Sequence, residues 1–97
     1  MTRKLIVHPR VEAQAGGARD WYDAQRPGLG DRFVDELEVA VKKAHEPPLL
    51  SQKVHTEIRR ILMRRFPYAI FFVSTESQVS VLGLLRQSEN PEKWGHL

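Results

Sequence analysis

Four arginines lie within eight residues in the second half of the chain, in the segment Ile58-Arg59-Arg60-Ile61-Leu62-Met63-Arg64-Arg65. A guanidinium group can bind phosphate or carboxylate through two parallel hydrogen bonds, so clustered arginines are typical of a surface that recognises nucleic-acid backbone or an acidic protein. We expect Arg60, Arg64, Arg65 and Arg86 to form a basic surface that binds a target. The alternative is that these charges are solvated and protect an exposed sheet edge from aggregation.

The net charge of +3 is concentrated in the same part of the chain. Residues 1–50 carry eight basic and eight acidic side chains, whereas residues 51–97 carry seven basic and four acidic ones. A localised positive field favours an anionic partner. The charge pattern therefore agrees with a target that is nucleic acid or an acidic protein.

No other constellation of reactive residues stands out in the sequence. The chain has no cysteine, which excludes disulfides, thiolate zinc sites and cysteine nucleophiles. The histidines show no spacing typical of metal ligands, so we expect no metal and no cofactor; they are His8, His45, His55 and His96. Gly28-x-Gly30 lies between two predicted helices, which favours a turn over a phosphate-binding loop.

Length and composition predict one globular domain over residues 1–97, because 97 residues with a 41% hydrophobic fraction suffice for a single core. The longest apolar runs, Tyr68–Val73 and Val81–Leu85, are too short to span a membrane. The N-terminal residues also lack the apolar core of a signal peptide. We therefore expect a cytoplasmic protein without membrane association.

Hydrophobic periodicity predicts the elements that must position these residues. A short strand over Arg3–His8 is followed by helices over Arg10–Gln25 and Asp31–His45, and then by three strands over residues 55–65, 68–75 and 78–85. This order predicts an α+β fold in which a four-stranded antiparallel sheet carries the N-terminal helix hairpin on one face. Gly16 and Gly17, in the middle of the first helix, are interpreted as a point of close packing against another element; the alternative is a locally weak helix.

The predicted strands are apolar on both faces. In Tyr68–Val73, alternate residues of both sets are apolar, and Val79–Leu85 behaves similarly. Two short helices can cover one face of a four-stranded sheet but not both. We expect a partner protein to cover part of the second face; the alternatives are a second copy of the chain, the C-terminal tail with Trp94, or residual exposure of scattered apolar groups.

Three segments together resemble the RelE/ParE superfamily of bacterial toxins from type II toxin–antitoxin modules. Residues 21–33, with the turn Arg-Pro-Gly-Leu-Gly, resemble the family's helix–loop–helix. Residues 58–70 are similar to its basic strand and the turn that follows. Residues 79–85, followed by Asn-Pro-Glu-Lys-Trp at positions 90–94, resemble its last strand and tail. The three segments span nearly the whole chain.

The resemblance implies a cognate, ParD-like antitoxin that neutralises the toxin and through which the complex can bind operator DNA. It also implies roles in growth inhibition and plasmid stabilisation. We expect the antitoxin to place an amphipathic helix or an added strand against the helix hairpin and the exposed sheet. The residues expected to contact it are aromatic or large aliphatic: Trp21, Tyr22, Phe33, Phe72 and Leu84.

The superfamily contains two kinds of toxin, because RelE-like members cut mRNA on the ribosome and ParE-like members inhibit DNA gyrase. A metal-free endoribonuclease here would have to use Arg60, Arg64 and Arg86 to stabilise the phosphorane. No tyrosine follows Tyr68, although RelE-like nucleases commonly have one near the C-terminus. The family's frequent His-x-x-Arg-Asp-Pro reads Arg-Gln-Ser-Glu-Asn-Pro at positions 86–91.

These departures favour a ParE-like toxin that acts by binding rather than as an enzyme. The alternatives are a RelE-like endonuclease and a degenerate, non-toxic interaction module.

Overall fold

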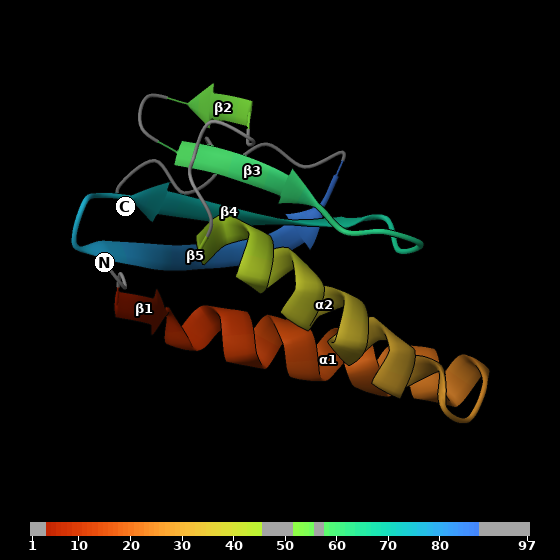
Figure 1. Ribbon diagram of the computed structural model, residues 1–97. Coiled ribbons are helices and arrows are strands. Elements are labelled where there is room, and N and C mark those ends of the chain that lie inside the picture. Colours follow the sequence, from red (N-terminus) through yellow and green to blue (C-terminus); the bar gives the residue numbers. More distant parts are fainter. Residues whose placement is uncertain (1–3, 46–51, 56–57, 88–97) are drawn as a thin grey trace.

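The computed structural model describes residues 4–45, 52–55 and 58–87, and consists of one sheet with two helices against it (Figure 1). The elements follow in the order β1 (Lys4–Val7), α1 (Pro9–Gln25), α2 (Leu29–His45), β2 (Gln52–His55), β3 (Ile58–Leu62), β4 (Tyr68–Ser74) and β5 (Gln78–Arg86). The predicted α+β fold with a helix hairpin on one face of the sheet is confirmed.

The sheet differs from the prediction in two details. It has five strands in the order β1-β5-β4-β3-β2, because a short strand, β2, was not predicted and precedes β3, which lies within the strand predicted over residues 55–65. Its first strand, β1, pairs with β5 in parallel, whereas the remaining pairs are antiparallel. A tight turn forces neighbouring strands to run antiparallel, but β1 and β5 are joined only through the rest of the chain, so no turn sets their direction.

Both helices begin where local chemistry favours a start. Pro9 occupies the first turn of α1, where its missing N–H is not needed, and the His8 side chain caps the helix by accepting a hydrogen bond from the Arg10 backbone N–H at 3.1 Å. In α2, Asp31 lies in the first turn and Lys42, Lys43 and His45 in the last, which complements the helix dipole.

Gly16 and Gly17 do not mark a close contact, contrary to the sequence-based interpretation. Both are exposed, and a Cβ atom built on either residue would meet nothing within 4 Å. The helix is locally weak there rather than closely packed. Each glycine loses more conformational entropy on folding than alanine would, and no neighbouring element requires the missing side chain.

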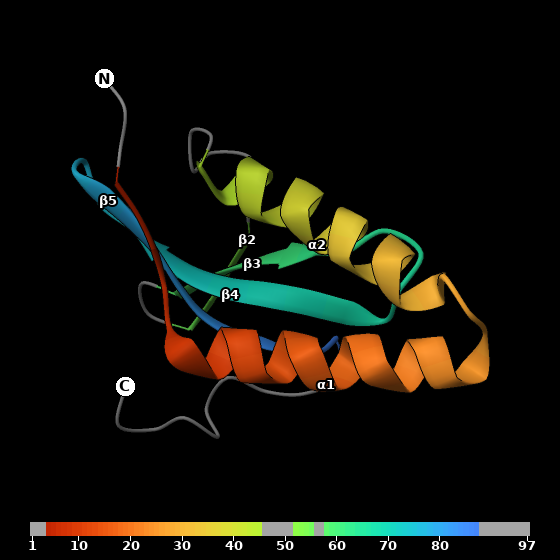
Figure 2. The same cartoon turned by 90° about the horizontal axis from the view of Figure 1, so that it is seen from below.

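The main core lies between the helix hairpin and the sheet. Figure 2 shows α1 and α2 running across the same side of the sheet. The two helices are joined at one end and move apart toward their other ends. The buried residues come from both layers: Val11, Ala18, Phe33, Ala40 and Ala44 from the helices, and Met63, Phe66, Ile70, Phe72, Val79, Val81 and Leu84 from the strands and the β3–β4 turn. This core fixes the hairpin relative to the turn.

The second face of the sheet carries a smaller apolar cluster of Ile58, Ala69 and Phe71, flanked by Val73, Leu82 and Leu85. Ala69 and Phe71 have no exposed surface. The centre of this face is therefore already buried within this chain and is not open to the partner that we expected to cover it. Trp94, one of the covers expected from the sequence, lies outside the described residues.

The large exposed hydrophobic side chains in the described part of the chain are Leu5, Ile6, Trp21, Val39 and Leu62. Leu62 is paired with Ala69 and therefore lies on the second face, at its margin. Among the described residues, neither helix is long and apolar enough to cross a membrane.

Candidate partner-binding site

Arg60 of β3 and Arg86 of β5 point to opposite faces of the sheet. Residues directly opposite each other in neighbouring strands share a face. Arg60 is paired with Phe71, which belongs to the cluster on the second face. Arg86 is paired with Tyr68, which packs against the core on the helix side. Arg60 and Arg86 therefore cannot converge on one phosphate group.

Arg64 and Arg65 are not strand residues. The strand β3 ends at Leu62, and both arginines lie exposed in the turn that leads to β4. The structure therefore does not bring Arg60, Arg64, Arg65 and Arg86 together on one face of the sheet. These arginines are divided between two sheet faces and a turn, because the strand is shorter than the run of alternating residues suggests.

Three of the five residues expected to contact an antitoxin belong to the core instead. Phe33 and Phe72 have no exposed surface and Leu84 is 2% exposed, so none of them is available to a partner. These three apolar side chains face the interior between the hairpin and the sheet rather than a partner. Trp21 is 55% exposed and Tyr22 is half-buried, so these two remain accessible.

Tyr22 is the centre of an aromatic cluster that joins α1, α2 and the β3–β4 turn. Its ring packs against Phe33, Phe66 and Tyr68 at centroid distances of 5.4, 4.9 and 6.4 Å. The exposed Trp21 packs edge-on against the same ring at 5.1 Å. Edge-to-face pairs of this kind contribute roughly 0.5–1.5 kcal/mol each beyond the area they bury.

Electrostatics keep the Tyr22 hydroxyl protonated. Burial raises the pKa of the Tyr22 phenol above its ordinary value, and neighbouring Tyr68 raises this pKa further, while Arg86 lowers it. The Arg86 guanidinium lies 5.6 Å from the centroid of the Tyr68 ring, a cation–π distance. Tyr22 is therefore suited to donate a hydrogen bond to a partner and not to act as a base at neutral pH.

An open pocket of about 520 Å³ lies between the start of α2 and the β3–β4 turn. We call it the hairpin pocket; its lining residues are Tyr22, Leu29, Arg32, Asp35, Glu36, Arg65, Phe66 and Pro67. Its volume is in the range of sites that hold a small ligand or the side chains of a peptide, roughly 300–1,000 Å³. The residues that line it come from two parts of the sequence, residues 22–36 and 65–67.

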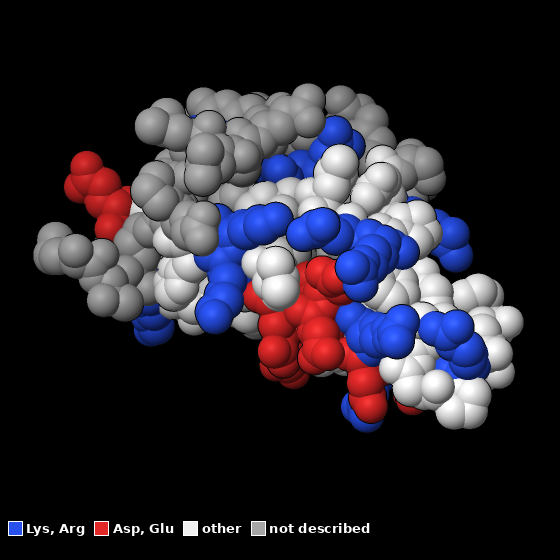
Figure 3. All heavy atoms as spheres, turned by 45° about the vertical axis from the view of Figure 1, so that its right-hand side comes forward, with Lys and Arg blue, Asp and Glu red and all other residues white. Residues whose placement is uncertain are grey.

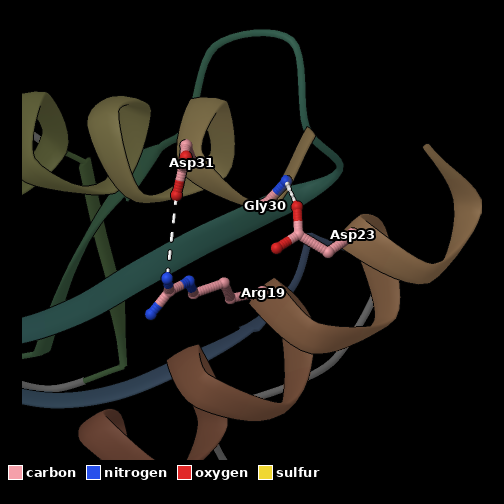
Figure 4. A network of polar contacts seen from close by, with 4 residues as sticks. All are labelled: Arg19, Asp23, Gly30 and Asp31. Carbon is pink, nitrogen blue, oxygen red and sulfur yellow. Dashed lines mark hydrogen bonds and ion pairs between the residues drawn. The ribbon is translucent and has the colours of Figure 1, made fainter. Parts of the chain in front are cut away.

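The wall formed by the helices is positioned by polar contacts at the hairpin loop (Figure 4). The Asp23 carboxylate of α1 accepts a hydrogen bond from the Gly30 backbone N–H of α2 at 2.7 Å. Next to it, the Arg19 guanidinium lies 3.7 Å from the Asp31 carboxylate. Because the Gly30 N–H belongs to the first turn of α2, Asp23 supplies that helix with a cap from a neighbouring element.

The loop also needs its glycines. Gly28 has a φ of +88°, a conformation that residues with a side chain rarely adopt. A Cβ atom on Gly30 would lie 2.6 Å from the Arg19 carbonyl oxygen and 2.7 Å from the Asp23 carboxyl group. The two helices can therefore approach as closely as they do only because this position has no side chain.

Comparisons with known proteins agree with this architecture. No family model matches the chain. Its sequence is 29% identical over 92 residues to the toxin ParE2 of Mycobacterium tuberculosis, in strains CDC 1551 / Oshkosh and ATCC 25618 / H37Rv, and the match covers 94% of this chain and 88% of that protein. The chain is thus ParE-like in sequence over nearly its whole length.

A comparison of folds agrees with this similarity. The solved structure described as the chromosomal ParDE TA system from P. aeruginosa superposes with a TM-score of 0.76. The match covers 88% of this chain and 96% of that chain, at 16% sequence identity. This ParE-like chain thus shares its fold with a protein whose sequence has diverged widely.

Sequence reasoning missed most of the hairpin pocket of this ParE-like chain. Leu29, Arg32, Asp35 and Glu36 were not singled out, although Arg65 was, as part of a basic surface. Helical spacing places Arg32 and Glu36 beside the buried stripe of α2, which was the available signal. It could not show that the β3–β4 turn lies opposite them, since that depends on how the hairpin packs on the sheet.

Proposed function

We propose that this ParE-like toxin of a type II toxin–antitoxin module acts by binding and inhibiting DNA gyrase, and that a ParD-like antitoxin neutralises it. The observation that carries the proposal is the resemblance to the toxin ParE2 over nearly the whole of both chains. We further propose that residues 1–97 form one toxin domain, that it works in the cytoplasm, and that the complex binds operator DNA through the antitoxin.

The arrangement of the arginines supports binding rather than RNA cleavage. Stabilising a phosphorane requires cations that converge on one phosphate. Arg60 and Arg86 lie on opposite faces of the sheet, and Arg64 lies in a turn beyond the end of β3. Inhibition by occupying a partner does not need cations that converge in this way.

Expression alone and with the neighbouring gene tests the proposal. Expressed alone, the protein should arrest growth of a bacterial host, and co-expression of the protein encoded beside it should relieve the arrest. Cells under arrest should form filaments and show induced DNA damage, as expected when gyrase is inhibited. Primer extension on cellular mRNA supplies the contrast, because codon-phased cleavage would replace this proposal by a ribosome-dependent endoribonuclease. Absence of arrest would instead favour a non-toxic interaction module.

A further inference from the structure

The hairpin pocket has an apolar floor. Phe66 is 8% exposed and Tyr22 and Leu29 are half-buried, so an entering side chain would meet aromatic rings and a leucine rather than backbone. Pro67 completes the apolar part of the lining. The exposed Trp21 packs against the Tyr22 ring from outside the pocket and extends the aromatic surface beyond it. Such a floor binds a large apolar side chain by removing its surface, and that of the rings, from water.

The rim is charged, with one arginine on each wall. Arg32 comes from α2 and Arg65 from the β3–β4 turn, and α2 also contributes Asp35 and Glu36. Figure 3 shows basic and acidic side chains gathered next to one another on the face it presents. A partner that fits this rim must place its own charges in matching positions.

The two carboxylates differ in what they already contact. Glu36 already has a cationic neighbour, because its Oε2 atom lies 3.9 Å from the Arg65 Nε atom. The Arg65 side chain is nevertheless 74% exposed, so this long contact contributes little and leaves most of the guanidinium open to a partner. Arg32 is exposed beside it on the other wall. The rim therefore offers two guanidinium groups to an anion, with Asp35 and Glu36 as the groups that oppose it.

The backbone of Arg65 adopts a conformation that is unfavourable for a residue with a side chain. Arg65 has a φ of 68°, and within the described residues it is the only non-glycine residue with a positive φ. Side chains rarely occupy this region, and such conformations persist where the surrounding structure imposes them. Here the turn is fixed by the buried residues on either side, Met63 and Phe66.

We propose that the hairpin pocket seats one large apolar side chain of the antitoxin, while Arg32 and Arg65 hold a carboxylate of a neighbouring residue in the same peptide. The inference rests on the proposed function, since it needs an antitoxin. An acidic, amphipathic peptide satisfies both the apolar floor and the guanidinium groups, and it complements the chain's net charge of +3. A nucleic-acid backbone fits less well, because its phosphates would leave the aromatic floor uncovered.

The test measures the affinity of the purified protein for the protein encoded by the adjacent gene, by isothermal titration calorimetry. Arg65→Glu and Arg32→Glu should each weaken binding about tenfold or more, because they place an anion against the partner's carboxylate. Matched controls reverse equally exposed charges outside the pocket: Arg64→Glu in the same turn, and Lys42→Glu on α2, about 15 Å from Arg32 along the helix axis. Both controls should change affinity by less than about threefold.

Two further variants sharpen the assignment. Asp35→Asn removes one opposing anion and should tighten binding by roughly two- to threefold. Exchanging the partner's acidic residue for arginine should restore the affinity of Arg65→Glu toward that of the unmodified pair, which a merely structural effect of the substitution would not do. Circular dichroism of each variant checks that its fold is intact.

The outcomes separate this inference from the function on which it rests. If the adjacent gene product does not bind the unmodified protein, the proposed function and the inference both fail. If it binds the unmodified protein and all variants equally, the pocket is not the contact, although the proposed function stands. Loss of gyrase inhibition in Arg65→Glu with unchanged antitoxin affinity would also overturn the inference, because the pocket would then serve the target.

Discussion

The helix hairpin contains glycines in two regions, and they do opposite things. Gly16 and Gly17 in the middle of α1 face open space, and a Cβ on either would meet nothing within 4 Å. At the loop between the helices, Gly28 adopts a φ of +88° and Gly30 lies against the backbone of α1, where a Cβ would come within 2.6 Å of the Arg19 carbonyl oxygen. The residue type is the same, but only the loop requires it.

This contrast shows where the fold is held to a narrow geometry. The loop carries the close approach, the Asp23 hydrogen bond and one wall of the hairpin pocket, whereas the middle of α1 is solvated and tolerant of change. Precise positioning is concentrated at the end of the molecule where we propose that the antitoxin binds. The contrast can be tested with substitutions in both regions.

The largest effect is expected for Gly30→Ala. The added methyl group would overlap the Arg19 carbonyl oxygen, which is backbone and cannot rotate away, so the helices must separate. We expect the free energy of unfolding to fall by about 3 kcal/mol, at the upper end of overpacking effects. Urea denaturation measures this change. A loss below about 0.5 kcal/mol would mean that the loop is no more constrained than the middle of α1.

A smaller loss is expected for Asp23→Ala, which removes the acceptor of the Gly30 N–H hydrogen bond. Loss of a helix cap costs about 0.5–2 kcal/mol, and we expect roughly 1.5 kcal/mol because Asp23 is half-buried. Asp23→Asn serves as the control, since the amide oxygen can still accept this bond. Equal destabilisation by the two substitutions, measured by thermal denaturation, would contradict the capping role.

The opposite sign is expected in the other region. Gly17→Ala fills open space and reduces the entropy of the unfolded chain, so it should stabilise the protein by about 0.8 kcal/mol. Gly16→Ala is expected to behave similarly. A rise in the midpoint of urea denaturation would confirm the prediction, whereas destabilisation would restore the interpretation of these glycines as a packing contact.

The smallest change in stability is expected for Arg65→Gly. Glycine adopts a positive φ without strain but adds conformational entropy to the unfolded state, so the net gain should be only about 0.5 kcal/mol. The same substitution removes a proposed antitoxin contact and should weaken binding. Urea denaturation measures the gain in stability, and calorimetric titration measures the loss of affinity for the antitoxin. An unchanged affinity would argue against a role of Arg65 in binding.

Much of the fold could be predicted from the sequence because it depends on local periodicity. The spacing of Phe33, Leu37, Ala40 and Ala44 identified α2, and the apolar runs identified β4 and β5. The short strand β2 and the parallel pairing of β1 with β5 were missed, since both depend on contacts between distant segments. Apolar runs could not reveal that the second face of the sheet is closed over Phe71.

The site was harder to predict because it is assembled by tertiary packing. Phe33, Phe72 and Leu84 were recognised as important apolar positions, but a sequence does not distinguish a buried apolar residue from one that binds a partner. Arg65 was identified from its charge, whereas its backbone conformation and its position opposite Arg32 follow only from the fold.

The most direct test of the central claim is a supercoiling assay with DNA gyrase and the purified protein. The account predicts that the protein inhibits supercoiling in a dose-dependent manner and that the protein encoded by the adjacent gene restores gyrase activity. Undiminished supercoiling at all concentrations, together with codon-phased cleavage of mRNA in cells that express the protein, would contradict it.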